Sequence, residues 1–231
     1  MTKNEILENI KGSVIVSCQA LPDEAMYVEE KSIMYLMARA AKRAGSPAIR
    51  TSSVRDVVAI KEETNLPVIG LIKRKYENSE VYITPTMKEV DELVEAKSDI
   101  VAIDCTFSKR LDDENINDFI KNIKEKYIDI IIMADISTYE EGINAYNMGV
   151  DIVGTTMNGY TKQSLEKNIS NLELVKQLTT KINIPIIAEG KINYPEQVKE
   201  MIDAGAYCVV VGGAITRPYE IAKRFIEASK K

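Results

Sequence analysis

The stretch DIIIMADISTYEEGINAYNMGVDIVGT, residues 129–155, contains a complete strand–helix–strand unit. Residues 129–135 and 150–155 are short apolar runs rich in isoleucine and valine, which favour strands. Residues 138–148 between them have helical spacing and end at Gly149, a typical helix stop. Because both strand runs are almost continuously apolar, we expect them to lie in a parallel sheet that is covered on both faces.

Similar apolar runs recur along the chain, and each is followed by a segment with helical spacing. The candidate strands are 13–17, 47–50, 67–73, 99–104, 129–135, 150–155, 184–189 and 207–212. The candidate helices are 31–44, 55–64, 87–97, 115–126, 138–148, 172–181, 195–204 and 218–229, after a short amphipathic helix at about 2–11.

This alternation continues without a linker, so it predicts one α/β domain over residues 1–231. The number of units and the chain length favour a single (β/α)8 TIM barrel. An open doubly wound sheet is the competing architecture. It usually has fewer strands, and the GxGxxG motif typical of its dinucleotide-binding members is missing after the first strand.

The composition excludes several kinds of site. The 231 residues include 30 Lys and Arg, 35 Asp and Glu and no histidine, for a net charge of −5. Without histidine there is no imidazole base, no Ser-His-Asp triad and no His-ligated zinc. The acidic balance argues against a nucleic-acid scaffold.

The cysteines and the N-terminus bear on the compartment. Cys18, Cys105 and Cys208 are isolated in the sequence, which argues against a thiolate zinc cluster and is typical of a reducing, cytoplasmic setting. The N-terminus does not resemble a signal peptide, and no apolar run approaches the roughly 20 residues of a membrane span.

Polar residues stand where the apolar runs stop, and TIM barrels carry their chemistry at the C-terminal ends of the strands. These strand-end positions are Gln19, Arg50, Lys73, Asp104, Asp135, Thr155 with Thr156, Glu189 and the pair Gly212-Gly213. We therefore expect their side chains to surround one mouth of the barrel.

Two of these positions suit acid–base chemistry. Lys73 ends a wholly apolar run, where desolvation would lower its pKa and free the amine as a general base. Glu189 ends another apolar run, where a raised pKa would let it act as an acid. Each also has a structural interpretation, Lys73 as the start of a solvated basic turn and Glu189 as an ion-pair partner of Lys73 or Arg50.

Asp104 and Asp135 end neighbouring strands. Either can hold a lysine amine or bind sugar hydroxyls, and Asp104 in particular can simply cap the following turn. A Mg²⁺ site is the alternative for acidic strand ends. It is disfavoured here because the adjacent Lys and Arg residues would neutralise the carboxylates, so no metal site is predicted.

A phosphate-binding pattern lies late in the chain. Gly190 follows the seventh run, and GGAITR, residues 212–217, follows the eighth run and opens the last helix. Glycines let main-chain N–H groups approach phosphate oxygens, and loops at this place bind phosphate in many TIM barrels. Gly190, Gly212, Gly213 and Arg217 are the predicted phosphate-binding residues, with a plain glycine-rich turn as the alternative.

Several segments resemble the bacterial N-acetylmannosamine-6-phosphate 2-epimerase family, in the same order over nearly the whole chain. They are IVSCQALPDE (15–24), PVIGLIKRKY (67–76), YITPTMKEVDEL (82–93), MADIST (133–138), GTTMNGYT (154–161) and VVGGAITRP (210–218). One loop departs from the family, which usually has Pro-Leu-His-Ser-Ser after LPDE. This chain has AMYVEEKS at residues 25–32.

The resemblance implies a TIM-barrel isomerase of sialic-acid catabolism, which interconverts N-acetyl-D-mannosamine 6-phosphate and N-acetyl-D-glucosamine 6-phosphate without a cofactor. It implies Lys73 as the base, Glu189 as its acid partner and Asp135 as the group that orients Lys73 and the sugar. The expected substrate contacts are Gln19, Arg50, Thr155 and Tyr160. The resemblance also places Gly190, Gly213 and Arg217 at the phosphate.

Other functions of a phosphosugar barrel fit less well. A ribulose-phosphate-type 3-epimerase relies on a histidine-bearing metal site, and a decarboxylase needs an Asp-x-Lys-x-x-Asp cluster; this sequence has neither. A phosphosugar-binding sensor is the non-enzymatic alternative, against which Lys73 and Glu189 argue.

The expected partner is therefore a phosphosugar, with no nucleic acid and no membrane. The resemblance also implies a homodimer. The C-terminal helix is the expected contact, through Ile221, Phe225 and Ile226.

Overall fold

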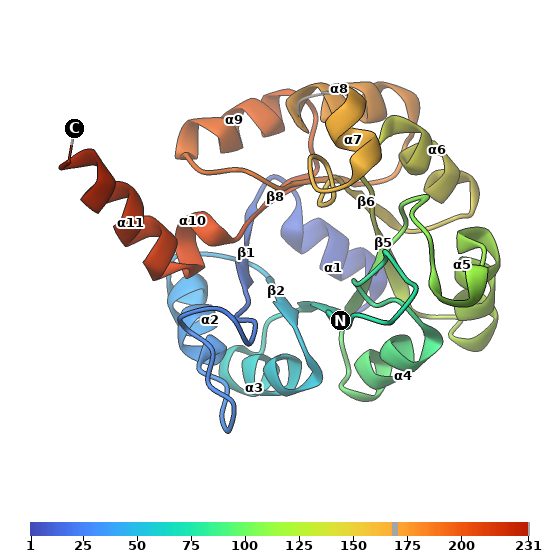
Figure 1. Ribbon diagram of the computed structural model, residues 1–231. Coiled ribbons are helices and arrows are strands. Elements are labelled where there is room, and N and C mark those ends of the chain that lie inside the picture. The colour runs from blue at the N-terminus through green and yellow to red at the C-terminus, as the bar shows by residue number, and fades with distance from the viewer. Residues whose placement is uncertain (168–170, 231) are drawn as a thin grey trace.

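The computed structural model describes residues 1–167 and 171–230, and its parallel strands close into a barrel in the order β1 to β8 (Figure 1). Strand β1 pairs with both β2 and β8, which completes the circle. The strands are β1 Val14–Cys18, β2 Ile49–Ser52, β3 Val68–Leu71, β4 Ile100–Asp104, β5 Ile131–Asp135, β6 Ile152–Gly154, β7 Ile186–Glu189 and β8 Cys208–Val211. Each overlaps a predicted apolar run, and the predicted (β/α)8 TIM barrel is confirmed.

Helices form where the helical spacing predicts them. They are α2 Met34–Arg43, α3 Val54–Thr64, α4 Met87–Glu95, α5 Ile116–Lys126, α6 Tyr139–Asn147, α8 Asn171–Lys181, α9 Pro195–Asp203 and α11 Pro218–Ala228. All of these except α11 pack around the barrel (Figure 1). Two short helices, α7 Lys162–Lys167 and α10 Gly213–Thr216, were not predicted as separate elements. They are too short for an apolar repeat to mark them.

The glycine pair does not open the last helix, as the sequence suggested. It opens α10, a single turn, and Arg217 then leaves the helical conformation with φ −115° and ψ 78° before α11 begins at Pro218. A residue that precedes proline avoids the helical region for steric reasons, so the two helices are separated at this point.

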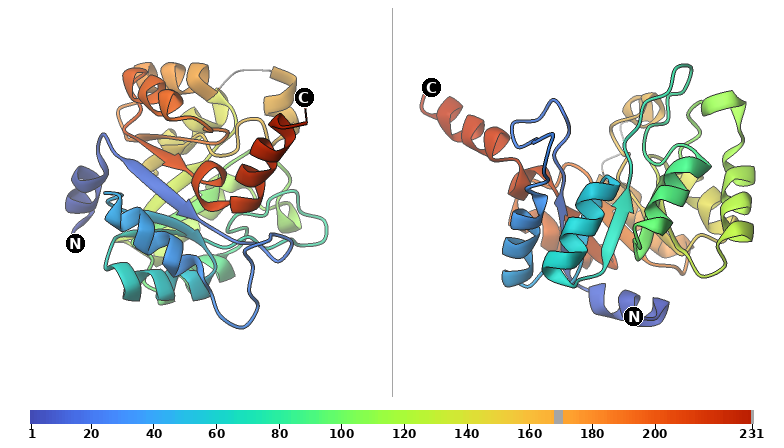
Figure 2. Two further views of the ribbon diagram at one scale, coloured as in Figure 1. Left: turned by 90° about the vertical axis from the view of Figure 1, so that its left-hand side faces the viewer. Right: turned by 90° about the horizontal axis from the view of Figure 1, so that it is seen from below.

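The short N-terminal helix α1, Lys3–Ile10, closes one end of the barrel (Figure 2). Thr2 and Glu5 form a capping box at its start. Its Ile6 and Ile10 are buried in the same apolar cluster as the residues that fill the barrel interior. The opposite end, where the strands finish, is thereby left as the entrance to a site.

The pleat of each strand sorts its side chains between the barrel interior and the helix layer. In β6, Ile152 belongs to the interior cluster, whereas Val153 packs among residues under the helices. The same alternation, continued to the strand ends, assigns polar residues to the interior. They are Ser17, Gln19, Arg50, Lys73, Asp104, Asp135, Thr156 and Glu189.

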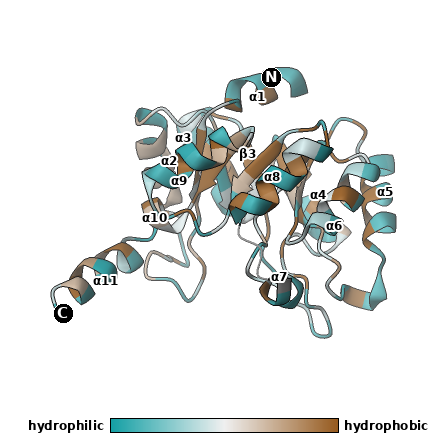
Figure 3. Cartoon of the chain, turned by 90° about the horizontal axis from the view of Figure 1, so that it is seen from above, coloured by the Kyte–Doolittle hydropathy of each residue, from teal (hydrophilic) through white to brown (hydrophobic). Residues whose placement is uncertain are grey.

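Helix α11 projects away from the barrel (Figure 1), and none of its residues is buried. Apolar residues lie along it (Figure 3), and Phe225 and Ile226 are 74% and 55% exposed. Within the residues that the structure describes, no helix is long and apolar enough to cross a membrane.

Candidate active site

A cavity of about 850 Å³ opens at the C-terminal ends of the strands. All but two of the predicted site residues line it. They are Gln19, Arg50, Lys73, Tyr160, Glu189, Gly190, Gly212, Gly213 and Arg217. The other two, Asp135 and Thr155, are fully buried and are not part of the cavity wall.

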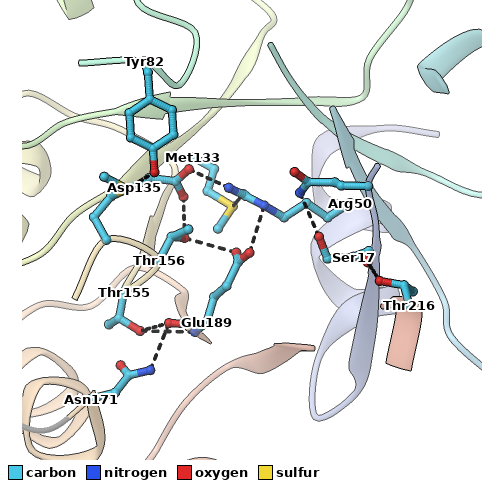
Figure 4. Close-up of polar contacts among 12 residues, drawn as sticks. Ser17, Arg50, Tyr82, Met133, Asp135, Thr155, Thr156, Asn171, Glu189 and Thr216 are labelled. Carbon is cyan, nitrogen blue, oxygen red and sulfur yellow. Dashed lines mark hydrogen bonds and ion pairs between the residues drawn. The ribbon is translucent and has the colours of Figure 1, made fainter. Parts of the chain in front are cut away.

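Arg50 stands at the centre of the polar floor and is only 1% exposed. Its Nη2 lies 2.6 Å from Asp135 Oδ2, and its Nε lies 3.1 Å from Glu189 Oε1 (Figure 4). A buried cation needs such partners, because desolvation of an unpaired charge costs several kcal/mol. The guanidinium therefore ties the ends of β2, β5 and β7 together.

Asp135 is fully buried and lies beneath the residues that line the cavity. Its carboxylate is paired with Arg50 and also accepts a hydrogen bond from Thr156 Oγ1 at 2.7 Å (Figure 4). The resemblance implies that Asp135 orients Lys73 and the sugar, and this stays a prediction. In the structure the side chain is fully buried, and its carboxylate contacts Arg50 and Thr156.

Thr155 was predicted to bind substrate, and the structure corrects this. The alternation along β6 turns its side chain away from the interior, and its Oγ1 lies 3.2 Å from both the main-chain N and the main-chain O of Glu189. Asn171 Nδ2 donates to the carbonyl oxygens of Glu189 and Gly190 at 2.9 and 3.0 Å. Thr155 and Asn171 therefore fix the backbone that carries Glu189.

Thr156 takes the place in the wall that Thr155 was expected to hold. Its hydroxyl lies between two carboxyl groups, 2.7 Å from Asp135 Oδ1 and 3.1 Å from Glu189 Oε2 (Figure 4). The sequence marked both threonines as strand-end residues, and the two-residue pleat of the strand is the signal that distinguishes them.

Burial sets the protonation of Glu189. Desolvation raises its pKa to about 7, against the lowering effect of Arg50, and Asp135 adds a further rise. An acid with this pKa retains its proton in a large share of molecules at neutral pH. The predicted acid role is consistent with this environment.

Lys73 follows β3, where its backbone bridges to Ile83. Desolvation lowers the pKa of its ammonium, and the charges of Arg50 and Arg217 lower it further, whereas Glu24 and Glu189 oppose the shift. The side chain is only partly exposed and lines the cavity, so the interpretation as a solvated basic turn does not apply.

Asp104 behaves as a turn residue. Its Oδ1 accepts hydrogen bonds from the backbone N of Thr106 at 3.0 Å and from its hydroxyl at 2.7 Å. Burial raises its pKa to about 6. Within residues 1–167 and 171–230, no group of three or more Cys, Asp or Glu side chains is arranged to hold a metal ion.

The predicted phosphate end is built around Gly190 and Arg217. Gly190 has φ +103°, and a Cβ there would come within 3.3 Å of the Thr156 carbonyl oxygen, so glycine is required. Arg217 is paired with Glu24 at 2.5 Å and with Glu220 at 3.5 Å. A bound phosphate would therefore compete with two carboxylates for this guanidinium.

Other residues of the wall were not predicted as site residues, among them Tyr82, Lys191 and Lys75. Tyr82 comes from the loop after β3. Lys191 follows Gly190, and its Nζ lies over the ring of Tyr160, 5.2 Å from the ring centre. Lys75 adds another cation. The divergent segment 25–32 does not line the cavity, whereas Leu21, Pro22 and Asp23 just before it do.

Comparison with known proteins identifies the family of this chain. Residues 34–231 match the family model NanE, described as "Putative N-acetylmannosamine-6-phosphate epimerase". The chain belongs to this family. A relative from Clostridium perfringens strain ATCC 13124, named as the corresponding 2-epimerase, is 50% identical over 97% of this chain and 100% of its own length.

Further proteins named as this epimerase are similar to the chain in sequence and in structure. A relative of the same name from Caldanaerobacter subterraneus is 49% identical over 98% of this chain and 95% of its own. The solved N-acetylmannosamine-6-phosphate 2-epimerase from Clostridium perfringens superposes with a TM-score of 0.90 at 50% identity and covers 96% of both chains. A thiamine phosphate pyrophosphorylase from Pyrococcus furiosus, with a TM-score of 0.62 at 18% identity over 97% of this chain and 96% of its own, shares the fold alone.

The raised pKa of Glu189 predicts a pH dependence of stability. Its carboxyl has a pKa near the ordinary value of 4.5 in the unfolded chain and about 7 in the folded one. The folded state thus binds more protons between these values, and the free energy of unfolding falls as the pH rises from about 4.5 to about 7. Urea unfolding should show a clearly smaller fall in Glu189→Gln than in the wild type, because Asp104, whose pKa is also raised by burial, contributes to the fall in both.

The matched control is Glu196→Gln, which changes an exposed glutamate on α9. It should leave the wild-type pH dependence in place. Curves for Glu189→Gln that run parallel to the wild type would contradict the assignment.

Proposed function

We propose that this protein interconverts N-acetyl-D-mannosamine 6-phosphate and N-acetyl-D-glucosamine 6-phosphate by removing and returning the proton on C2. The observation that carries the proposal is that Lys73 and Glu189 line one cavity while burial shifts their pKa values toward each other. A lowered amine pKa favours the neutral lysine that a base must be, and a raised carboxyl pKa favours the protonated glutamate that an acid must be. Family membership supports the substrate class.

The chemistry follows from the open-chain sugar. The C2 proton lies next to the C1 aldehyde, so its removal gives an enolate, and protonation of O1 converts this into an enol whose C2 carries the acetamido nitrogen. The carbonyl itself makes a cofactor unnecessary. The Lys73 amine takes the C2 proton while Glu189 protonates O1. The enol then presents its opposite face to the Lys73 ammonium, which gives its proton to C2 while the O1 proton returns to Glu189. This inverts the centre and restores the neutral amine and the neutral carboxyl.

Two neighbours support these steps. Arg50 lies beside Glu189 and stabilises its carboxylate after the proton has left. Gln19 donates through Nε2 to Ser17 Oγ at 2.8 Å, and its buried Oε1 has no hydrogen-bond partner among the described residues. An unpaired buried acceptor in the wall is suited to a hydroxyl or amide N–H of the sugar.

The phosphate binds at the other end of the cavity, between Arg217 and the backbone at Gly190, Gly212 and Gly213. Arg217 supplies a charge-assisted contact, and the glycines expose main-chain N–H groups. This end of the substrate is remote from C2, so it contributes to binding more than to the proton transfers.

We further propose that the protein is a cytoplasmic homodimer whose contact is α11. Its three cysteines are unpaired and buried, which suits a reducing compartment. The apolar side chains of Phe225 and Ile226 are exposed on a helix that leaves the barrel, and a second copy would cover them.

Lys73→Ala and Glu189→Ala should each lower the rate of C2 proton exchange with D₂O by about 10²–10⁴-fold, since each removes one member of an acid–base pair. Proton NMR of the substrate in D₂O measures this directly, and circular dichroism checks that the fold is kept. Full exchange in both variants would remove these residues from the base and acid roles.

Arg217→Ala should raise KM by about 10- to 100-fold and change kcat only a few-fold, because a lost charge-assisted contact costs roughly 1.5–3 kcal/mol of binding. Arg224→Ala, which changes an exposed arginine of α11 outside the cavity wall, is the matched control. A large loss of kcat at unchanged KM would contradict the phosphate assignment.

Phe225→Asp should convert the dimer to a monomer in sedimentation velocity, because it places a charge in the proposed apolar contact. Lys223→Asp also introduces an aspartate, but on the opposite face of α11, and should leave the dimer largely intact. Equal masses for the wild type and Phe225→Asp would refute α11 as the contact.

A further inference from the structure

The Thr156 hydroxyl lies between two buried carboxyl groups and can donate its single proton to only one of them. Its Oγ1 is 2.7 Å from Asp135 Oδ1 and 3.1 Å from Glu189 Oε2. If the hydroxyl donates to one carboxylate, a hydrogen bond to the other exists only when that other group carries a proton. The arrangement therefore distinguishes the two carboxyl groups.

The surrounding contacts indicate which group carries the proton. Asp135 is fully buried, is paired with Arg50 Nη2 at 2.6 Å and has the shorter contact with Thr156. Short contacts of this kind are typical of an ionised acceptor. Glu189 is held at the longer distance of 3.1 Å by both Arg50 Nε and Thr156.

The charge balance leads to the same assignment. The single positive charge of Arg50 is balanced by Asp135 alone, so a protonated Glu189 leaves this buried trio with no net charge. Ionisation of Glu189 would instead add an unbalanced negative charge in a desolvated place. Desolvation and the charge of Asp135 raise the pKa of Glu189, whereas a hydrogen bond donated by Thr156 to its carboxylate lowers it. The proton therefore stays on Glu189 when the Thr156 hydroxyl donates to Asp135 instead.

We propose that Thr156 is a positioning residue that keeps the transferable proton on Glu189, by donating to Asp135 and accepting from the Glu189 carboxyl. This inference rests on the proposed function, in which Glu189 gives a proton to O1. When that proton leaves Oε2, the Thr156 hydroxyl turns and donates to the new Glu189 carboxylate, while Asp135 retains its pairing with Arg50. Return of the O1 proton to Glu189 restores the first arrangement.

The backbone holds Thr156 in place for this role. Gly154 and Ile187 are partners in the pairing of β6 with β7, so Thr156 and Glu189, each two residues further on, lie at one level. The two contacts of Thr155 with the Glu189 backbone lock these strand ends together. The hydroxyl position is therefore set by the barrel and not by a mobile loop.

Thr156→Val and Thr156→Ser test the proposal. Valine removes the hydroxyl at nearly constant shape, so the neutral form of Glu189 loses its acceptor. We expect kcat to fall about 10- to 100-fold with KM nearly unchanged. We also expect the alkaline limb of the kcat–pH profile to move about one unit toward lower pH. Thr156→Ser retains the hydroxyl and should restore both quantities to near wild-type values.

The other ionisable groups that face Glu189 are the same in all variants. They are Arg50 from β2, Lys73 after β3, Asp135 from β5 and Cys208 from β8. Each comparison uses one substrate, so its phosphate ionisation cancels. Thermal melting verifies folding, and Thr156→Ala is a second hydroxyl-free variant with the same expected result.

The outcomes separate this inference from the proposed function. A wild-type enzyme that does not exchange the C2 proton would refute the function itself. Wild-type kcat in a hydroxyl-free variant, or an alkaline limb that stays in place or moves upward, would overturn only the role of Thr156. Failure of a folded Thr156→Ser to restore kcat would overturn it as well.

Discussion

The guanidinium of Arg50, buried in the barrel with 1% exposure, must be neutralised by groups from other strands, and the rest of the site depends on this constraint. Asp135 and Glu189 supply the negative charge from β5 and β7. Removal of one partner of a buried ion pair typically costs about 3–5 kcal/mol. The same contacts thus connect three strand ends and set the electrostatics of the cavity.

One cation shared by two carboxyl groups leaves Glu189 as the group that can hold or release a proton. Asp135, fully buried and closest to Arg50, remains the fixed anion. Arg50 also helps to keep Lys73 from binding a proton strongly, because it adds a like charge to a partly desolvated amine. Burial thus lowers the pKa of the Lys73 ammonium and raises that of the Glu189 carboxyl, which are the shifts that the proposed base and acid need.

The sequence alone predicted the barrel and several of the residues that line the cavity. The apolar runs predicted the strands of the barrel, because strand length and burial leave a local signal in the sequence. The positions at the ends of these runs predicted that Lys73 and Glu189 would line the cavity. The choice of Thr155 over Thr156 was wrong because it used position along the run and ignored the two-residue pleat. The pairing of Arg217 with Glu24 was not predictable, because it depends on how a loop after β1 packs against the end of β8.

The central claim is that Glu189 holds its proton at nearly neutral pH. Carbon-13 NMR of protein labelled at the glutamate carboxyl carbons measures this directly, with Glu189→Gln to assign the signal. The account predicts one carboxyl resonance that titrates near pH 7 and is missing in the variant. If the Glu189 resonance titrates near the ordinary glutamate value of 4.5, the account is contradicted.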